Sequence, residues 1–425
     1  MSHVYGNGTN STSGANTITH HYDRAGVKAA TANLIYGQFA DSKSMPQKYG
    51  KTFKISMWEQ ILDGAGVAGA GLNKDGDASD GNLYGSNRDI GNITSGLPVL
   101  GEGANDVNRV VVTKKTGEVS FNRFGLFLEY SDEVELFSED KTQMIYREML
   151  GDAAKQVNED LIQKDMLSGA NVYYVGSATS RATVGQDTTG TGAEGDNDDA
   201  DSVIGYDDVR KIVATLVSNR ARKYTSIVTG STKVDTKTIN ASYIGIVGPE
   251  IKYDLQGVAD MHSRPAWIPV NQYGSAATLL DQEVGAIDEM RFIESERAMK
   301  FIGAGAAIPA GYTGTLANDG SKFNVYPILC PTEGAFATVG LQGWGKMKFK
   351  SKAPGAVEQA DKFGLKGFFS VNWFYAGIIL DQSKLLRVET CATDIGIGQY
   401  GSGDINGNDT VDYGEVNYNG PAVMN

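Results

Sequence analysis

The sequence contains few of the residues on which metal centres and nucleophilic active sites are built. There are two cysteines and four histidines in 425 residues. The cysteines, Cys330 and Cys391, are far apart and match no zinc-ligand spacing, and they do not make the disulfide framework of a small secreted domain. Three histidines lie within the first 21 residues, which leaves His262 for the rest of the chain. Neither a zinc site nor a Ser–His–Asp site is therefore expected.

Long hydrophobic runs and nucleotide-binding motifs are also missing. The longest apolar run, residues 373–380, is much shorter than the ~20 residues that span a bilayer, and the N-terminus has no basic-then-apolar signal peptide. No Gly-x-x-x-x-Gly-Lys-Ser/Thr motif occurs, and the glycine-rich residues 64–71 follow no buried strand. We expect no membrane partner, no catalytic residue, no metal ligand and no bound cofactor.

Positive charge is scarce except at the N-terminus. The chain has a net charge of −13, which disfavours broad binding to nucleic acid. Residues 1–60 nevertheless carry six lysines and arginines against three carboxylates. Because residues 1–20 of this segment are polar, we expect an extended arm, and its positive charge suits docking onto an acidic neighbour or onto nucleic acid. A terminal segment whose charge is incidental is the alternative.

Glycine, in contrast, is abundant, and it separates short strand patterns from one long helical pattern. There are 53 glycines, nearly twice the usual share of ~7%, which indicates many turns. Residues 138–169 contain no proline, and their apolar side chains recur every three to four positions. Ser138 can cap this helix and Gly169 can end it. An ordinary core helix is the alternative to a long spine. The predicted apolar stripe is Ile145, Met149, Ala153, Val157 and Leu161.

The remaining patterns predict an α+β protein. Strands are expected in residues 110–137, 172–175, 225–229, 243–247, 291–293, 301–302, 334–350 and 366–389. A second helix is expected over residues 209–217, after an acidic loop at 185–208. Alternation of strands and helices favours a compact domain over residues 205–344.

One pattern in the acidic C-terminal tail resembles a calcium-binding loop. Oxygen-bearing side chains stand at positions 1, 3, 5, 7, 9 and 12 of residues 404–415, which is the spacing that can surround Ca²⁺. Asp409 occupies the sixth position, where the sharp turn needs glycine, so a solvated acidic tail is the alternative. Asp75, Asp77 and Ser79 form a weaker fragment. A carboxylate-pair hydrolase also stays open, because the chain has 51 acidic residues. The six candidate ligands are Asp404, Asn406, Asn408, Thr410, Asp412 and Glu415.

Four stretches together carry a resemblance to a known family. They are GDAAKQVNEDLIQKDML in the long helix, YDDVRKIVATLV in the second helix, AIDEMRFIESERAM at 286–299 and GFFSVNWFYAGIILDQSKLLRVET at 367–390. With the order of arm, loop, long helix and C-terminal strands, the chain resembles the major capsid proteins of tailed bacteriophages, of the Hong Kong 97-type fold. It is most similar to the branch of N-four-like coat proteins. The resemblance covers residues 20–392.

The resemblance implies a division of the chain into parts. These are an N-terminal arm (1–60), an extended loop (61–125), a peripheral domain (126–204 and 345–395) with the spine helix 138–169, an axial domain (205–344) and an acidic C-terminal tail (396–425). An arm and a loop of this kind become ordered when they bury surface against neighbouring subunits.

The resemblance also implies a function without catalysis. The chain would assemble with itself into hexamers and pentamers of an icosahedral phage head that encloses double-stranded DNA. Portal, scaffold and cement proteins are further implied partners, and the packaged DNA would be touched without sequence specificity at the inner face. The implied location is the virion capsid, with the host cytoplasm during assembly. A calcium-dependent surface or adhesion module, based on residues 404–415, is the alternative function.

Overall fold

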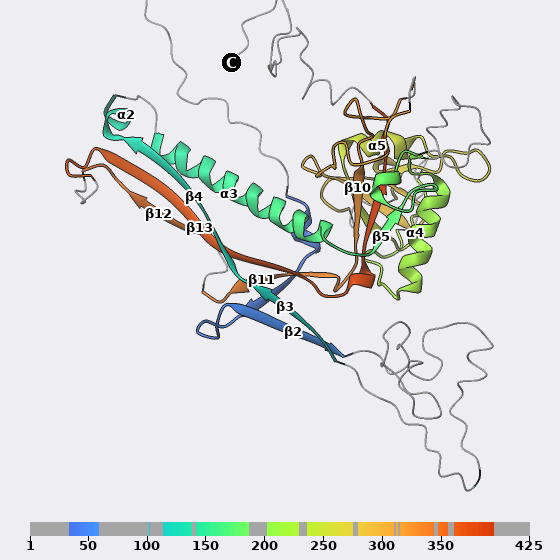
Figure 1. Ribbon diagram of the computed structural model, residues 1–425, viewed down its shortest axis with the longest axis horizontal. Coiled ribbons are helices and arrows are strands. Elements are labelled where there is room, and N and C mark those ends of the chain that lie inside the picture. The colour runs from blue at the N-terminus through green and yellow to red at the C-terminus, as the bar shows by residue number, and fades with distance from the viewer. Residues whose placement is uncertain are drawn as a thin grey trace, which may run out of the picture. The chain divides into compact units, whose positions relative to one another are not determined.

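The computed structural model describes residues 34–58, 102, 114–137, 142–186, 202–228, 236–274, 279–309, 312, 315–343, 347–355 and 361–394. These residues fall into two compact units. The first contains residues 125–157 and 348–372, and the second contains the other described residues. Helix α3 (Thr142–Leu167) and strands β4 (Asn122–Ser131) and β13 (Lys366–Ile379) contribute residues to both units (Figure 1).

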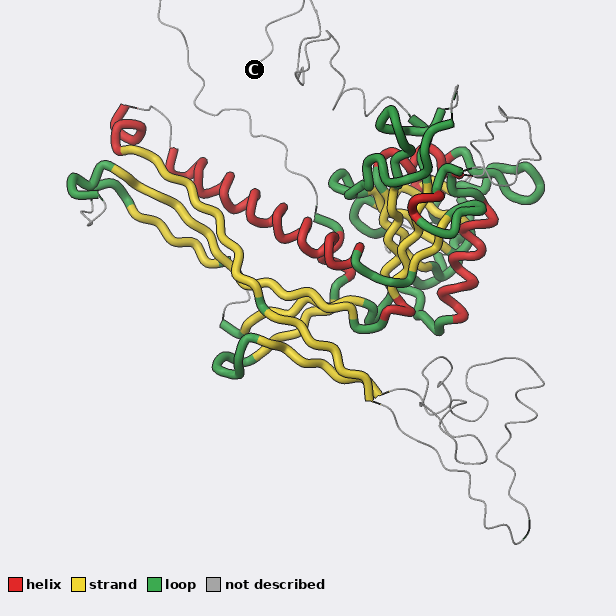
Figure 2. Tube along the Cα trace, viewed as in Figure 1, coloured by secondary structure: helices red, strands yellow, loops and turns green. Residues whose placement is uncertain are grey.

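The first unit combines the start of α3 with long strands. Strand β12 (Lys348–Lys352) pairs antiparallel with β13, and β4 pairs with β13 on its other side (Figure 2). The aromatic ring of Tyr130 stacks on Phe369 with centroids 5.5 Å apart and also meets Tyr146 of α3. Arg147 lies over the ring of Phe349. The buried rings of Tyr130 and Phe369 form the small core of this unit, and the Arg147–Phe349 contact lies at its surface. A short helix, α2 (Asp132–Phe137), follows β4.

Helix α3 differs from its prediction in its start and in its buried face. It begins at Thr142, and the expected cap Ser138 lies outside the described residues. Ile145 and Met149, predicted to be buried, are 44% and 60% exposed. The buried stripe is instead rotated by one residue. Apolar side chains occupy two faces of this helix, so spacing alone selected the wrong face. The buried apolar residues of α3 are Leu150, Ala154, Ile162 and Met166.

The second unit is built on a seven-stranded mixed sheet. Its order is β5 (Val172–Tyr174), β14 (Leu385–Thr390), β10 (Tyr326–Pro331), β6 (Tyr243–Val247), β9 (Met290–Glu294), β8 (Glu283–Ile287) and β7 (Ile268–Pro269). The pairs β5–β14 and β6–β9 are parallel, and the others are antiparallel. Short 3-10 helices lie at Tyr36–Phe39, Arg181–Thr183, Val270–Gln272 and Gln382–Lys384.

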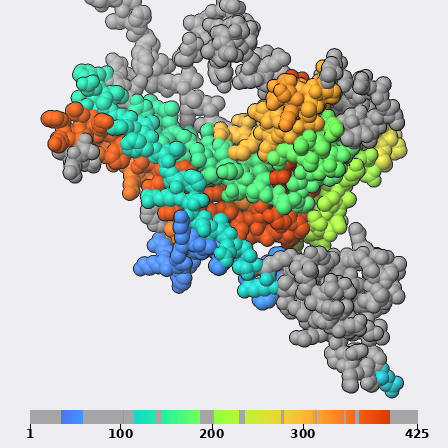
Figure 3. Space-filling model, viewed as in Figure 1, coloured from blue at the N-terminus to red at the C-terminus, as the bar shows by residue number. Residues whose placement is uncertain are grey.

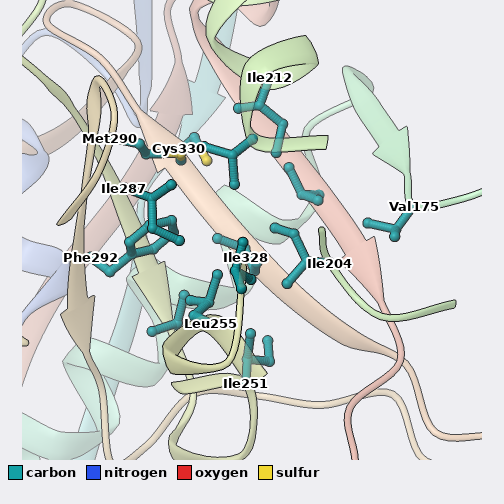
Figure 4. Close-up of a cluster of buried hydrophobic side chains, with 14 of the residues drawn as sticks. Val175, Ile204, Ile212, Ile251, Leu255, Ile287, Met290, Phe292, Ile328 and Cys330 are labelled. Carbon is teal, nitrogen blue, oxygen red and sulfur yellow. The ribbon is translucent and has the colours of Figure 1, made fainter. Parts of the chain in front are cut away.

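Two helices cover this sheet and complete its core. In α4 (Tyr206–Ser218), Asp208 accepts the N–H of Gly205 at 3.1 Å, which caps the first turn. In α5 (Pro249–Gln256), Pro249 supplies a residue whose missing N–H would be unpaired there in any case. Buried side chains of both helices, including Ile212 and Leu255, meet sheet residues such as Ile328 (Figure 4). The predicted helix at 209–217 is thereby confirmed.

A smaller sheet and a ribbon complete the second unit. Strand β1 (Asp41–Met45) pairs parallel with β11 (Phe336–Leu341), which pairs antiparallel with β13. Strands β2 (Thr52–Trp58) and β3 (Lys114–Ser120) form a separate two-stranded ribbon. The strands expected at 225–229 and 301–302 are reduced to isolated bridges at Val228 and Phe301.

Several predicted features lie outside the described residues. They are the polar residues 1–20, the glycine-rich residues 64–71, the fragment at Asp75, Asp77 and Ser79, most of the acidic loop, and the candidate calcium loop at 404–415.

Candidate assembly surfaces

The polar residues that could support chemistry are dispersed in the described parts of the chain. His262 is exposed, and its backbone N–H donates to Asp260 in a turn. Cys330 and Cys391 are free and fully buried, and burial raises the pKa of the Cys330 thiol. Among the described residues, no group of three or more His, Cys, Asp or Glu side chains is placed to hold a metal ion. None of the described helices is both long and apolar enough to cross a bilayer.

The ribbon of β2 and β3 has one apolar face and one open face. Phe53, Ile55 and Val119 pack against a cluster that includes Met45 and Ile378. Alternation along the strands turns the intervening side chains to the opposite face. The ribbon is therefore held to the small sheet by one face only. In Figure 3 the residues of β1 and β2, in blue, lie at the molecular surface.

The open face of the ribbon carries paired charges and an exposed tryptophan. Lys54 and Glu118 are directly opposite one another and form an ion pair. Trp58 is 63% exposed, and the Lys114 ammonium lies over its ring, 5.4 Å from the centroid. A large aromatic side chain held this way offers contact area to a partner protein, because tryptophan is enriched among the residues that dominate binding energy.

The first unit exposes a series of large apolar side chains. Residues of α2, α3, β4, β12 and the segment before β13 contribute to it. Monomeric soluble proteins seldom expose many such side chains together, whereas subunit interfaces do. We call this set the outer apolar residues. It consists of Phe127, Val134, Leu136, Phe137, Met144, Ile145, Met149, Phe349, Phe363 and Leu365.

Within the second unit, buried charges hold the end of α3. Arg387 donates to the carbonyl oxygen of Leu167, one of the last carbonyls of the helix. Its Nε lies 2.8 Å from Oε1 of Glu389, which also binds Arg181. Arg181 in turn lies over the ring of Phe301 at 3.6 Å. A carboxylate between two guanidinium groups thus fixes the turn from α3 into β5.

A second group of polar contacts holds the first described residues against α3. Glu159 of α3 is 5% exposed and accepts the backbone N–H groups of Tyr36 and Gly37. The hydroxyl of Tyr36 lies 2.9 Å from the side-chain amide of Gln163. Next to it, Arg297 forms two hydrogen bonds with Asp160, at 3.1 and 2.5 Å.

Sequence reasoning missed these charged residues. Arg387 and Glu389 alternate with leucine and valine in the strand LLRVET, and a charge in such a strand is a recognisable signal for a buried pair. Glu159 gave no such signal, because it is one of many charged residues on this helix.

Comparison with known proteins identifies the family. No family model matches the sequence. The chain is 32% identical, over 394 residues, to a protein named major capsid protein from Pseudomonas phage KPP21, and the match covers 91% of this chain and 95% of that protein. At this identity and coverage, the two chains share a family.

Solved structures show the same fold at much lower sequence identity. The capsid of Ralstonia phage GP4 aligns with a TM-score of 0.56 at 11% identity, over 91% of this chain and 99% of that one. The capsid of cyanophage P-SCSP1u aligns with a TM-score of 0.54 at 10% identity, over 90% of this chain and 95% of that one. The mature capsid of bacteriophage PhiM1 aligns with a TM-score of 0.50 at 12% identity, over 92% of this chain and 96% of that one. The assignment to an N-four-like branch stays a prediction. The α+β fold is of the Hong Kong 97 type, and the chain belongs to the major capsid proteins of bacteriophages, the coat proteins of the virion.

Proposed function

We propose that copies of this chain assemble into hexamers and pentamers, and that these close into an icosahedral head around double-stranded DNA. The observation that carries the proposal is the match to a phage major capsid protein over 91% of the chain. The exposed Trp58 and the outer apolar residues support it, because both provide surface that a neighbouring copy would bury.

The parts of the subunit take the following proposed roles. Residues 1–60 form the arm, 61–125 the extended loop, 126–204 with 345–395 the peripheral domain, 205–344 the axial domain and 396–425 an acidic tail. The ribbon of β2 and β3 supports this division because its strands flank residues 59–113, the greater part of the proposed loop. Strands β1 and β2 lie within the proposed arm, so its second half forms part of the second unit.

Further partners belong to the same proposal. Portal, scaffold and cement proteins would bind the assembled shell, and packaged DNA would contact its inner face without sequence specificity. The negative net charge supports weak rather than tight contact with DNA. The role is structural and not enzymatic. The calcium-dependent adhesion module has no supporting observation, because its motif lies outside the described residues.

Assembly is tested with the purified full-length chain. Sedimentation velocity over a range of concentrations, with negative-stain electron microscopy of the same samples, should reveal closed shells or pentamers and hexamers. A chain that stays strictly monomeric at every concentration would contradict self-assembly. The same measurements with and without a calcium chelator test the alternative function. Only a calcium-dependent module requires the ion for its folded state, so only that module would change when the chelator is added.

A further inference from the structure

Three of the first described side chains are buried in the second unit. Ile35, Tyr36 and Phe39 are 1%, 2% and 6% exposed. The ring of Phe39 meets Tyr224 edge-on, with centroids 5.6 Å apart. The chain therefore has a fixed point immediately after residue 33.

A buried carboxylate receives the backbone at this fixed point. Oε1 of Glu159 accepts the N–H groups of Tyr36 and of Gly37, the latter at 3.4 Å. The backbone N–H of Ile35 also lowers the pKa of this carboxyl. Two successive backbone N–H groups thus donate to one carboxylate oxygen, and successive backbone N–H groups of this kind bind anions. Burial raises the pKa of Glu159, and the three N–H groups act in the opposite direction.

Surrounding groups make this contact specific. The Tyr36 hydroxyl and the Gln163 amide lie 2.9 Å apart one turn further along α3. Asp160, the neighbour of Glu159, is bound by Arg297 from another part of the unit. Arg297 is bound to Asp160, and the Glu159 carboxylate accepts hydrogen bonds from backbone N–H groups. A buried carboxylate is expensive in this environment, and an apolar residue would satisfy packing alone. Its use here points to the positioning of the chain.

We propose that Glu159 is a positioning residue for assembly: it holds the backbone of Tyr36 and Gly37 on α3 and so fixes this part of the proposed arm on the subunit. This inference rests on the proposed function, because an arm that reaches a neighbouring copy must leave from a defined point. If the contact with Glu159 is lost, residues 34–39 must be ordered again when one copy binds the next. The cost of that ordering lowers the affinity between the two copies.

The test compares three substitutions of Glu159. Glu159→Gln keeps an oxygen that can accept both N–H groups, Glu159→Asp withdraws the carboxylate by one methylene, and Glu159→Ala removes it. A matched control is Asp254→Ala, because Asp254 is a partly buried carboxylate that accepts the N–H of Thr393 at the other end of the described chain. Each variant is examined by hydrogen exchange of peptides covering residues 34–40 and by sedimentation with electron microscopy.

We expect about tenfold faster exchange at the buried Tyr36 in Glu159→Ala and Glu159→Asp, because leaving a buried N–H group without an acceptor costs roughly that factor. Both variants should form at least about tenfold fewer assembled particles, and Glu159→Gln should restore both readouts. Asp254→Ala should leave exchange at residues 34–40 unchanged. If Glu159→Ala does not fold, Glu159→Asp carries the test.

Two results overturn the inference. Unchanged exchange at residues 34–40 in Glu159→Asp would show that the carboxylate does not hold the backbone. Faster exchange with normal assembly would show that the contact does not position the arm. Failure of the unmodified chain to assemble would count against the proposed function and would remove the assembly role of Glu159, while the exchange result would still decide the anchor.

Discussion

The guanidinium of Arg181 holds the carboxylate of Glu389 through two hydrogen bonds, one at 2.9 Å and one at 2.6 Å. The Glu389 side chain has no exposed surface, and Nε of Arg387 lies 2.8 Å from the same Oε1 that Arg181 binds. This one carboxylate joins β14, the 3-10 helix at Arg181–Thr183 and, through Arg387, the end of α3.

Glu389→Gln should destabilise the subunit by about 2–3 kcal/mol, because it leaves two guanidinium groups without their buried counter-charge. Urea denaturation of the subunit measures this change. Glu118→Gln is the control, since Glu118 pairs with Lys54 but is about half exposed, and exposed pairs contribute little. Equal effects of the two substitutions would contradict the importance of burial.

Adjacent positions on α3 should respond in opposite ways to a charge. Leu150→Asp buries a charge in the first unit and should abolish soluble protein, at a cost of several kcal/mol. Met149→Asp lies on the exposed face and should leave a soluble, folded subunit. Soluble yield and circular dichroism distinguish the two. Aggregation of Met149→Asp alone would restore the helix face predicted from the sequence.

Trp58→Ala should impair assembly without unfolding the subunit. Its ring is 63% exposed, so its removal changes the free energy of unfolding by less than about 0.5 kcal/mol. A buried interface tryptophan, in contrast, contributes ~2 kcal/mol or more to binding. Thermal unfolding and particle yield are measured together. Tyr253→Ala, on an exposed position of α5, is the comparison. Normal particle yield would remove Trp58 from the interface.

Asp165 should make the stability of the second unit depend on pH. Burial raises the pKa of this carboxyl from its ordinary value of 3.8, against the hydrogen bond from the Tyr375 hydroxyl at 2.8 Å. The folded state binds the Asp165 proton more tightly than the unfolded state does. Protonated Asp165 therefore adds to the free energy of unfolding, and this contribution is complete below pH 3.8. It is then lost as the pH rises through the raised pKa.

Two substitutions check this dependence by denaturation at several pH values. Asp165→Asn should remove the loss of stability above pH 3.8. Tyr375→Phe removes a hydrogen bond that lowers the pKa, so the loss should move to higher pH. An identical pH profile in all three proteins would show that Asp165 is not responsible.

The family, the α+β class and the long helix were accessible from the sequence, because they depend on periodicity and on the order of long segments. The face of α3 was not, because Ile145 and Leu150 are equally apolar and only tertiary packing chooses between them. The Glu159 contact was also hidden. Its partners are backbone N–H groups more than 120 residues away, and a backbone group leaves no mark in a sequence pattern.

The pairing of β1 with β11 has a consequence for synthesis of the chain. Among the described strands, β1 hydrogen-bonds to β11 alone, and Asp41 pairs with Ala337. At translation rates of about 5–20 residues per second, the partner strand emerges roughly 15–60 s after β1. Until then β1 is an edge without a partner, and contacts this distant in sequence form slowly. A chain truncated before β11 therefore cannot complete the small sheet, and β1 stays unpaired in it although the Glu159 contact of residues 36 and 37 is already available.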